Sequence, residues 1–295
     1  MNDRFDRRLS VLDDSAQQFI KAVAWLGGYV TTEQAHGLGI RNSVPRVHVE
    51  LKNLESWGFI KRVALYPAVY QVTKSVTRLL GTDLSARHRH PAETIRTRLL
   101  AVNFYLEAAN WPVEFVFDHQ QKIANFRQLG CEPCLLPQRA GKPYLWEDFV
   151  MHRHAGGLGV AAVDRYNHSA FLQLHELVKR FRRCLAFTPD QLKLMLVVGT
   201  DARYRLCTRL ARHPSLQKLL PSMPKAVTAA LRLYRVQQAV PAFRLLVQDN
   251  RDGRELRALG LHRPAEPNRS PRLAGAVQDD AKDIDSGFWP EEENE

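Results

Sequence analysis

The chain has 295 residues, of which 45% are hydrophobic and 25% charged, fractions that are ordinary for a globular protein. The glycine and proline content excludes collagen-like and Pro/Gly-rich disordered classes, and no apolar run approaches the ~18 residues of a membrane span. Lys and Arg outnumber Asp and Glu by 42 to 31, a net charge of +11, which favours a polyanionic partner. The charged N-terminus lacks the apolar stretch of a secretory signal. We therefore expect a cytoplasmic protein, with no membrane contact, that binds nucleic acid.

The charge is unevenly distributed along the chain. Residues 261–295 hold four basic and nine acidic side chains, a net charge of −5, which leaves +16 for residues 1–260. From residue 263 onward Pro, Ser, Asn, Asp and Glu dominate, a composition that cannot bury a core. The sequence thus predicts a disordered acidic tail over residues 263–295, attached to a strongly basic body.

Residues 12–81 are predicted to form three helices followed by a β-hairpin. The predicted elements are helices over 15–29, 31–35 and 43–57 and strands over 59–63 and 68–73. Gly27 stops the first helix, and Ser43 begins the third. Pro45 lies in the first turn of that helix, where its missing N–H is not needed. One further helical turn is expected at 75–81. This order predicts a helix-turn-helix with a two-stranded wing.

The third predicted helix has the two faces that a DNA recognition helix needs. Val47, Leu51 and Leu54 recur at i, i+4 and i+7, so one stripe packs inward. The exposed N-terminal half of such a helix enters the major groove, where Arg pairs with guanine and Asn with adenine, while Lys contacts phosphates. The predicted DNA-binding residues are Arg41, Asn42, Ser43, Arg46, His48, Val49, Lys52, Lys61 and Arg62.

The segment from Asn42 to Arg62 resembles the recognition helix and the start of the wing in winged-helix transcription factors. It has a polar cap, a helix ending in Leu54-Glu55, and then Gly58, an apolar residue, Ile and a basic residue. Residues 69–73 are similar to the strand that returns from the wing. The resemblance implies binding to double-stranded DNA, although the short wing lacks basic residues at its tip. Use of the winged helix for protein contact is the alternative.

A mixed α+β domain is predicted over residues 92–250, after a basic boundary segment at 82–91. The predicted elements are helices over 92–109, 120–130, 169–186, 201–213 and 225–238 and strands over 113–117, 144–152, 158–164, 193–198 and 242–247. The first helix is expected to bury one face, marked by Ile95, Leu99, Val102 and Leu106, and the strands over 144–152 and 158–164 are expected to form an antiparallel pair. A Pro-bearing loop is expected at 131–143. The domain would serve dimerisation, partner contact or additional DNA contact, and a homodimer would place two recognition helices about 34 Å apart.

Part of this second domain resembles the replication-relaxation family of plasmid and conjugative-element proteins. The resemblance is carried by Trp146–Phe149, Val160–Arg165, the apolar helix around Phe171–Phe181, Leu194–Val198 and Arg203. It implies a winged helix followed by a domain similar to the restriction-endonuclease-like fold. The implied role is transcription regulation, or replication or conjugative processing of a mobile element.

Nucleases of that fold hold a metal ion with carboxylates on a β-hairpin, assisted by a Lys. Asp148 matches the first acidic position of the family. The central strand pattern is Glu-x-Asp, and here Ala162 stands at the Glu position, Asp164 at the Asp, and Arg165 follows where a Lys is expected. We therefore expect a non-catalytic relative, with no metal and no cofactor. The alternative is a metal-dependent nuclease with Asp148 and Asp164 as ligands.

The predicted helix at 169–186 contains a second basic cluster. Its members are Lys179, Arg180, Arg182 and Arg183. They are interpreted either as a second DNA surface or as the solvated end of a helix, where cations are favourable.

The sequence contains two small groups of potential metal ligands. His152, His154 and His168 form a conceivable metal site, or else a wet basic surface. Cys131 and Cys134 form a CxxC pair without the second close pair that a structural zinc needs, so they are interpreted as two ordinary thiols in a loop.

Overall fold

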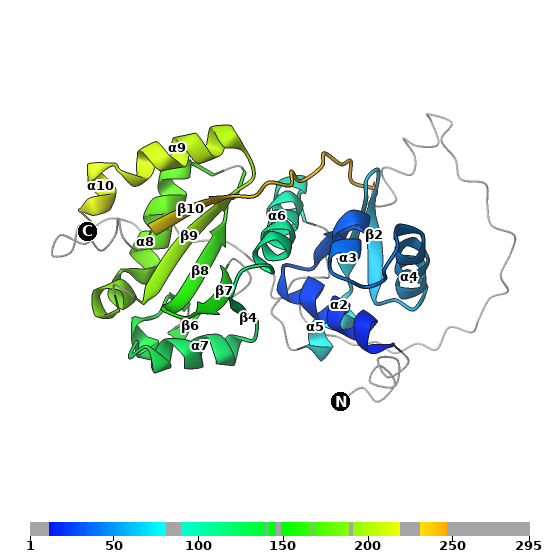
Figure 1. The fold of residues 1–295 in the computed structure, drawn as a ribbon, viewed down its shortest axis with the longest axis horizontal. Coiled ribbons are helices and arrows are strands. Elements are labelled where there is room, and N and C mark those ends of the chain that lie inside the picture. The colour runs from blue at the N-terminus through cyan, green and yellow to red at the C-terminus, as the bar shows by residue number, and fades with distance from the viewer. Residues whose placement is uncertain are drawn as a thin grey trace, which may run out of the picture. The chain divides into compact units, whose positions relative to one another are not determined.

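The computed structural model describes residues 12–80, 90–139, 141–145, 149–166, 168–188, 191–218 and 231–246. Over these ranges the chain is mixed α and β and belongs to one compact unit (Figure 1). The predicted tail at 263–295, most of the predicted boundary at 82–91, and Asp148 lie outside the described residues. The expectation of a mixed α+β fold is confirmed for the described part of the chain.

Residues 12–80, called here the N-terminal lobe, contain the predicted helices and hairpin. Its elements are α2 (Asp14–Trp25), β1 (Tyr29–Thr31), α3 (Thr32–Gly37), α4 (Val44–Ser56), β2 (Ile60–Leu65), β3 (Ala68–Val72) and α5 (Lys74–Leu79). The strand β1 was not predicted. It pairs antiparallel with β3, which also pairs antiparallel with β2, so the sheet has the order β1-β3-β2.

Local sequence signals explain where the helices of this lobe begin and end. The side chain of Asp13 accepts a hydrogen bond from the Ala16 N–H at the start of α2. Thr31 and Gln34 form a reciprocal capping box at the start of α3. Ser43 precedes α4 as predicted, but its side chain makes no capping hydrogen bond. Gly58 follows α4 with φ +79°, a left-handed conformation that favours glycine, and the chain turns into β2.

The core of the N-terminal lobe forms where α2 and α4 cover the small sheet. The predicted stripe on α4 is confirmed, since Val47, Leu51 and Leu54 are fully buried. They pack in one cluster with Phe19 of α2 and Tyr70 of β3. This packing fixes which side of α4 faces inward and therefore which side faces solvent.

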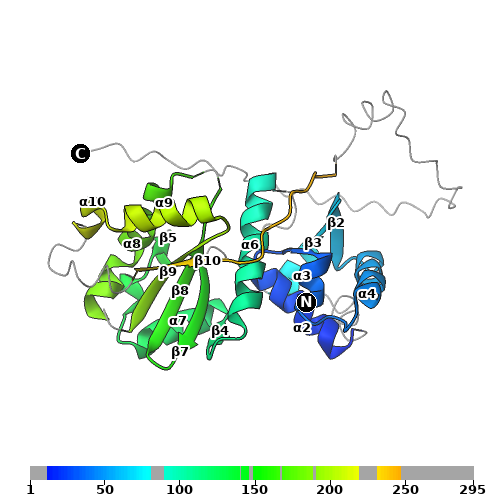
Figure 2. The same ribbon diagram turned by 45° about the horizontal axis from the view of Figure 1, so that its top comes forward.

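The helix α6 (Ala92–Ala108) is buried on more than the single face predicted for it. Ile95 and Leu99 pack with residues of the N-terminal lobe, whereas Leu100 and Phe104 pack against the larger sheet. Figure 2 shows α6 standing between the two groups of elements. The predicted stripe of Ile95, Leu99, Val102 and Leu106 contains residues of both contacts but leaves out Leu100 and Phe104, which are fully buried as well.

The remainder of the described chain, called here the C-terminal lobe, is built on a five-stranded sheet. Its strands are β4 (Glu114–Val116), β7 (Phe149–His154), β8 (Gly157–Val163), β9 (Leu192–Val198) and β10 (Leu231–Arg235), in the order β10-β9-β8-β7-β4. The strands β8, β9 and β10 are parallel, and β7 is antiparallel to both β8 and β4. The predicted antiparallel pair is therefore confirmed, although its first strand begins at Phe149 within the described residues.

Helices cover both faces of this sheet. The helical elements of the lobe are α7 (His119–Gln128), the 3₁₀ turn η1 (Pro133–Leu135), α8 (Ala170–Phe187), α9 (Asp201–Ala211) and α10 (Pro214–Gln217). The helices α7, α8 and α9 share one core cluster with Val160 and Leu194, while α6 packs with Ala161 and Val197, which point to the opposite face. A short hairpin, β5 (Gln138–Arg139) with β6 (Lys142–Pro143), lies in the predicted loop.

Two predicted elements near residue 240 are wrong. Residues 231–235, predicted as part of a helix over 225–238, form β10, because pairing with the neighbouring β9 overrides the local helical preference. The predicted strand over 242–247 is reduced to one bridge between Leu245 and Ala64 within the described residues. Pro241 lies just before this segment and has no N–H to donate to a ladder.

His152 is a buried titratable group in the C-terminal lobe. Its side chain lies over Gly159 of the neighbouring strand, where any larger residue would collide with the imidazole. The ring centroids of Phe115 and Trp111 lie 6.1 and 6.4 Å from that of His152. Burial, assisted by the nearby His154, lowers the pKa of His152 to about 4. The neutral imidazole is therefore the form that the folded state accepts.

We expect the stability of the protein to fall as the pH is lowered from 6.5 to 4. In this window an unfolded chain protonates His152 while the folded protein does not, so protons favour unfolding. The shift corresponds to a loss of about 3 kcal/mol in the free energy of unfolding. Denaturant titrations at several pH values measure it, and His152→Phe should flatten that part of the profile. An equally steep profile in the variant would contradict the assignment.

Candidate nucleic-acid interface

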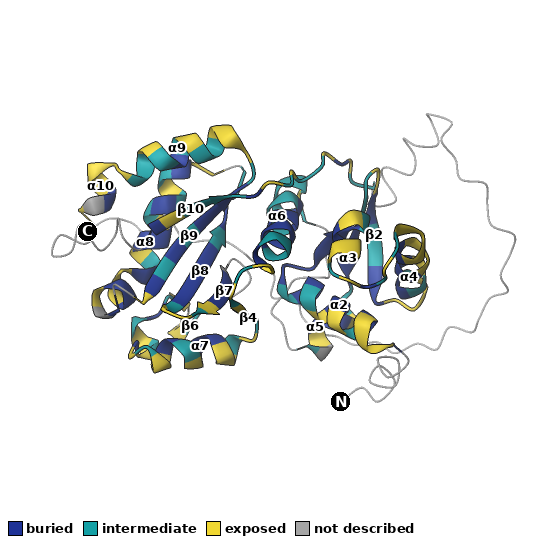
Figure 3. Ribbon diagram, in the orientation of Figure 1, coloured by how far each residue is buried: buried dark blue, intermediate teal, exposed yellow. Residues whose placement is uncertain are grey.

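The outer face of α4 is exposed and carries most of the predicted DNA-binding residues. Asn42, Arg46, His48, Val49 and Lys52 are all exposed, and Val49 keeps 60% of its accessible surface. Figure 3 shows this outer side of α4 as exposed while its inner side is buried. Thus the helix presents a continuous face that carries polar, basic and apolar groups to solvent.

The N-terminal end of α4 has its own side-chain contact. The guanidinium of Arg46 donates a long hydrogen bond of 3.4 Å to the side-chain oxygen of Asn42. A contact of this length between two exposed groups is weak. Both side chains therefore stay free to exchange it for a contact with a ligand, in the half of the helix where a major-groove reader makes its base contacts.

Arg41 does not point outward with the others. One nitrogen of its guanidinium lies 2.8 Å from the carboxylate of Asp13 and 2.8 Å from that of Glu50. The side chain of Glu50 is only 10% exposed, so Arg41 supplies the positive charge that this buried carboxylate needs. The prediction that Arg41 contacts DNA assumed that its charge is not paired within the protein. In the folded lobe the Arg41 guanidinium is paired with both carboxylates and holds α4 against the start of α2.

Ser43, Lys61 and Arg62 are half-buried at the edge of this face. The Arg62 guanidinium lies 5.4 Å from the centroid of the Tyr70 ring and 3.8 Å from the carboxylate of Glu55. Its backbone N–H also donates to Glu55. Arg62 is thus turned toward the lobe rather than displayed as an unpaired cation.

The hairpin between β2 and β3 ends in an exposed aromatic residue that sequence reasoning did not select. Tyr66 is 86% exposed at the tip, beside the half-exposed Leu65. The sequence drew attention only to the missing basic residues of this turn. The sequence signal that could have identified Tyr66 is its position directly before Pro67. Proline is common in turns, and turns place neighbouring side chains on the surface.

Asp164, the residue at the family's second acidic position, is fully engaged inside the protein. Its carboxylate receives three hydrogen bonds of 2.9 to 3.1 Å from the guanidinium of Arg203 and one of 2.9 Å from Gln173. The side chain of Asp164 is 2% exposed. This arrangement is a buried structural ion pair, in which a side chain with a permanent positive charge occupies the carboxylate.

The three histidines weighed as a metal site are not brought together. His152 lies beside Gly159 near the start of β8, and its ring centroid is 6.2 Å from that of His154. His168 follows the far end of β8, where its carbonyl accepts from Arg203. The strand length therefore separates His168 from the other two.

The CxxC pair is divided between the core and the surface. Cys134 is exposed, whereas Cys131 is buried with its sulfur 2.8 Å from that of Cys184 in α8. The hydrogen-bond contact with the Cys184 sulfur lowers the pKa of Cys131. The interpretation of Cys131 as an ordinary loop thiol missed this contact, because the partner lies 53 residues along the chain.

The second basic cluster lies on the outer side of α8. Lys179, Arg182 and Arg183 are exposed, while Arg180 forms an ion pair of 3.7 Å with Glu176 one turn earlier. Three of the four predicted residues are therefore displayed to solvent. The neighbouring helix α9 adds a row of exposed arginines, Arg205, Arg209 and Arg212, at spacings i, i+4 and i+7.

Comparison of the chain with protein-family models, with curated proteins and with solved structures finds no match. Within the described ranges, no three side chains of His, Cys, Asp or Glu gather closely enough to hold a metal ion. In the same part of the chain, no helix has both the length and the apolar character needed to cross a membrane.

We expect Arg41→Ala to destabilise the protein while Arg46→Ala does not. Removal of Arg41 leaves the carboxylate of Glu50 buried without its cation, a change that costs about 2 kcal/mol or more. Arg46 is exposed, and its loss should alter the free energy of unfolding by less than about 0.5 kcal/mol. Denaturant titration of the two variants measures this difference. Equal stabilities would show that the ion pairs of Arg41 contribute nothing to the fold.

Proposed function

We propose that the N-terminal lobe is a winged helix and that the protein binds double-stranded DNA with α4 in the major groove. The order helix, strand, helix, helix and β-hairpin supports this proposal, as does the three-stranded antiparallel sheet β1-β3-β2. The resemblance of residues 42–62 to winged-helix transcription factors has the same implication. The proposed role is that of a transcription regulator, or of a replication or conjugation accessory factor of a mobile element.

The observation that carries the proposal is the division of α4 into two faces. Its aliphatic side is locked into the lobe, and its outer side displays hydrogen-bonding and cationic groups that the described residues leave uncovered. The chemistry of that side suits base readout: Arg46 can donate two hydrogen bonds to guanine, and Val49 can pack on a thymine methyl group. Lys52, one turn further along, suits a phosphate contact.

The proposed DNA-binding set differs from the one drawn from the sequence in two places. Arg41 and Arg62 are assigned to holding the lobe together, because their guanidinium groups already face carboxylates. Tyr66 is added as a candidate contact at the hairpin tip, where its exposed ring can pack against a sugar or a groove wall. Asn42, Arg46, His48, Val49 and Lys52 form the central set, with Ser43 and Lys61 at its edge.

For the C-terminal lobe we propose a non-catalytic relative of the restriction-endonuclease-like fold. The hairpin β7–β8, followed by a helix and a parallel strand, supports the relationship. Asp164 supports the loss of catalysis, since its carboxylate is taken up by Arg203 and is not aimed at a ligand. The neighbouring Ala162 offers no side-chain oxygen to a metal ion.

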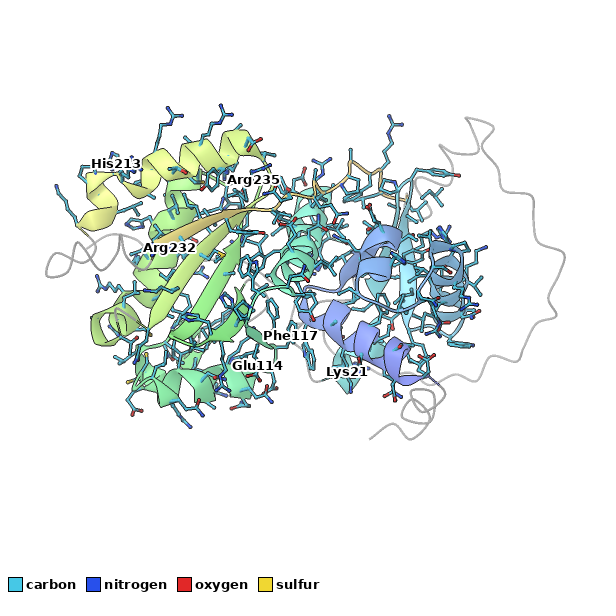
Figure 4. All side chains as sticks on the ribbon, in the orientation of Figure 1. Lys21, Glu114, Phe117, His213, Arg232 and Arg235 are labelled. Atoms are coloured by element: carbon cyan, nitrogen blue, oxygen red, sulfur yellow. The ribbon has the colours of Figure 1, made fainter. Side chains whose placement is uncertain are left out.

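We expect Arg46→Ala to weaken binding to the preferred DNA site by about 10- to 100-fold, because one bidentate base contact contributes about 1–3 kcal/mol. The site is first selected from a random duplex pool with the full-length protein, and affinities are then measured by fluorescence anisotropy at fixed salt. Lys21→Ala is the matched control, since Lys21 is an exposed cation on α2 of the same lobe (Figure 4). A similar loss of affinity in both variants would show that α4 contributes only nonspecific positive charge to DNA binding.

We expect no cleavage of plasmid DNA by the protein in the presence of Mg²⁺ or Mn²⁺. Asp164→Asn should instead lower the free energy of unfolding by about 3 kcal/mol, since Arg203 is left partly buried without its carboxylate. Gel analysis of supercoiled plasmid and denaturant titration give the two measurements. Cutting by the wild type that vanishes in Asp164→Asn would establish the nuclease alternative instead.

A further inference from the structure

The helices α8 and α9 together display a second cationic surface, called here the α8–α9 basic surface. Its residues are Lys179, Arg182 and Arg183 of α8 and Arg205, Arg209 and Arg212 at α9. All six are exposed, and in the described part of the chain none of them takes part in an ion pair. Within the described ranges, no acidic side chain therefore offsets their charges.

The topology of the sheet brings the two rows of cations together. The helix α8 connects β8 to β9, and α9 leads from β9 toward β10, and these three strands are parallel. Both helices must therefore run against the strands and end at the same edge of the sheet. They also share one core cluster on one face of the sheet. Five of the six basic residues lie in, or directly after, the second halves of the two helices, and Arg205 lies one residue before the middle of α9, so the six cations share one side of the lobe.

Acidic side chains on these helices do not neutralise this surface. Glu176 of α8 pairs with Arg180, and Asp201 of α9 pairs with Arg235. The segments 177–187 and 202–212 contain no acidic residue. The helix dipole accounts for Arg209, in the last turn of α9, and for Arg212 at its C-cap. It does not account for Arg205 or for the three cations of α8, which lie before the last turn of their helices.

The α8–α9 basic surface and the outer face of α4 lie on different sides of the molecule. The helix α6 packs on one face of the large sheet, between that sheet and the N-terminal lobe, whereas α8 and α9 pack on the opposite face. Figures 1 and 2 both show α4 and α9 on opposite sides of α6. A stiff duplex seated on α4 would have to bend around the molecule to reach the second surface.

We propose that the α8–α9 basic surface binds the phosphate backbone of a second DNA segment, so that one molecule bridges two duplexes. The inference rests on the proposed function of α4. The second contact is independent of sequence, because an arginine row of this kind offers charge along a backbone and no shaped reading face. The regularly spaced phosphates of duplex DNA supply the counter-charge that the described residues do not provide.

A bridging assay with the full-length protein tests this proposal. Beads carry a duplex with the selected site, and a fluorescent duplex without that site is added at about 0.15 M salt, where charges beyond a contact distance are screened. The key variant is Arg205→Gln/Arg209→Gln/Arg212→Gln. Its charge-matched control is Lys21→Gln/Arg127→Gln/Lys142→Gln, three exposed cations on other elements.

We expect the α9 variant to bind the bead-borne site within threefold of wild type and to retain at least fivefold less fluorescent duplex, while the control variant behaves as wild type. Unchanged bridging by the α9 variant would overturn the proposal but leave the proposed function of α4 intact. Such bridging would mean that a dimer holds each duplex with one of its two α4 helices. Equal losses of bridging in both variants would also overturn the proposal. It would likewise be overturned if a structured RNA displaced the second duplex at one tenth of the DNA concentration needed for the same displacement. Failure of wild type to bind the site at all would instead refute the proposed function.

Discussion

The arrangement of the described chain depends on the burial of α6 between two sets of elements. Asn103 of α6 is 1% exposed and is satisfied on both sides: its side-chain oxygen accepts from Gln34 of the N-terminal lobe at 2.6 Å, and its nitrogen donates to the carbonyl of Gln238 at 2.9 Å. A buried polar group that is fully hydrogen-bonded fixes one register, since any slip leaves it unpaired. Gln34 also donates to the Leu99 carbonyl, and Trp25 stacks on Phe117 at 5.3 Å. These contacts fix how the N-terminal lobe is seated on α6, through α3 and the loop after α2.

The arginines of the protein fall into two groups that net charge does not distinguish. Arg41 and Arg203 face buried carboxylates, where their removal would leave an uncompensated charge. Arg46 and, at α9, Arg205, Arg209 and Arg212 face solvent, where the cost of their mutual repulsion is small. Arginines of the first group are each balanced by a carboxylate, so the excess positive charge of the described residues comes from cations of the second kind.

Much of the N-terminal lobe could be predicted from the sequence because its signals are local. The stripe of Val47, Leu51 and Leu54, and the glycine after α4, act within a few residues of themselves. What the sequence did not reveal was decided by distant partners. The ion pairs of Arg41 were not predicted because Asp13 lies 28 residues away, and residues 231–235 were predicted as helical because only the neighbouring β9 makes them a strand. The double burial of α6 was missed for the same reason.

In the C-terminal lobe one buried ion pair joins the sheet to a helix. The carboxylate of Asp164 lies just after β8, and Arg203 brings a planar, permanently charged group to both of its oxygens. Because a guanidinium keeps its proton, this link between β8 and α9 persists at every pH at which the carboxylate is ionised. The pair fixes the first turn of α9, and the orientation of that helix in turn sets the direction of the arginine row that follows it. An inward-facing charge thus helps to determine where the outward-facing charges point.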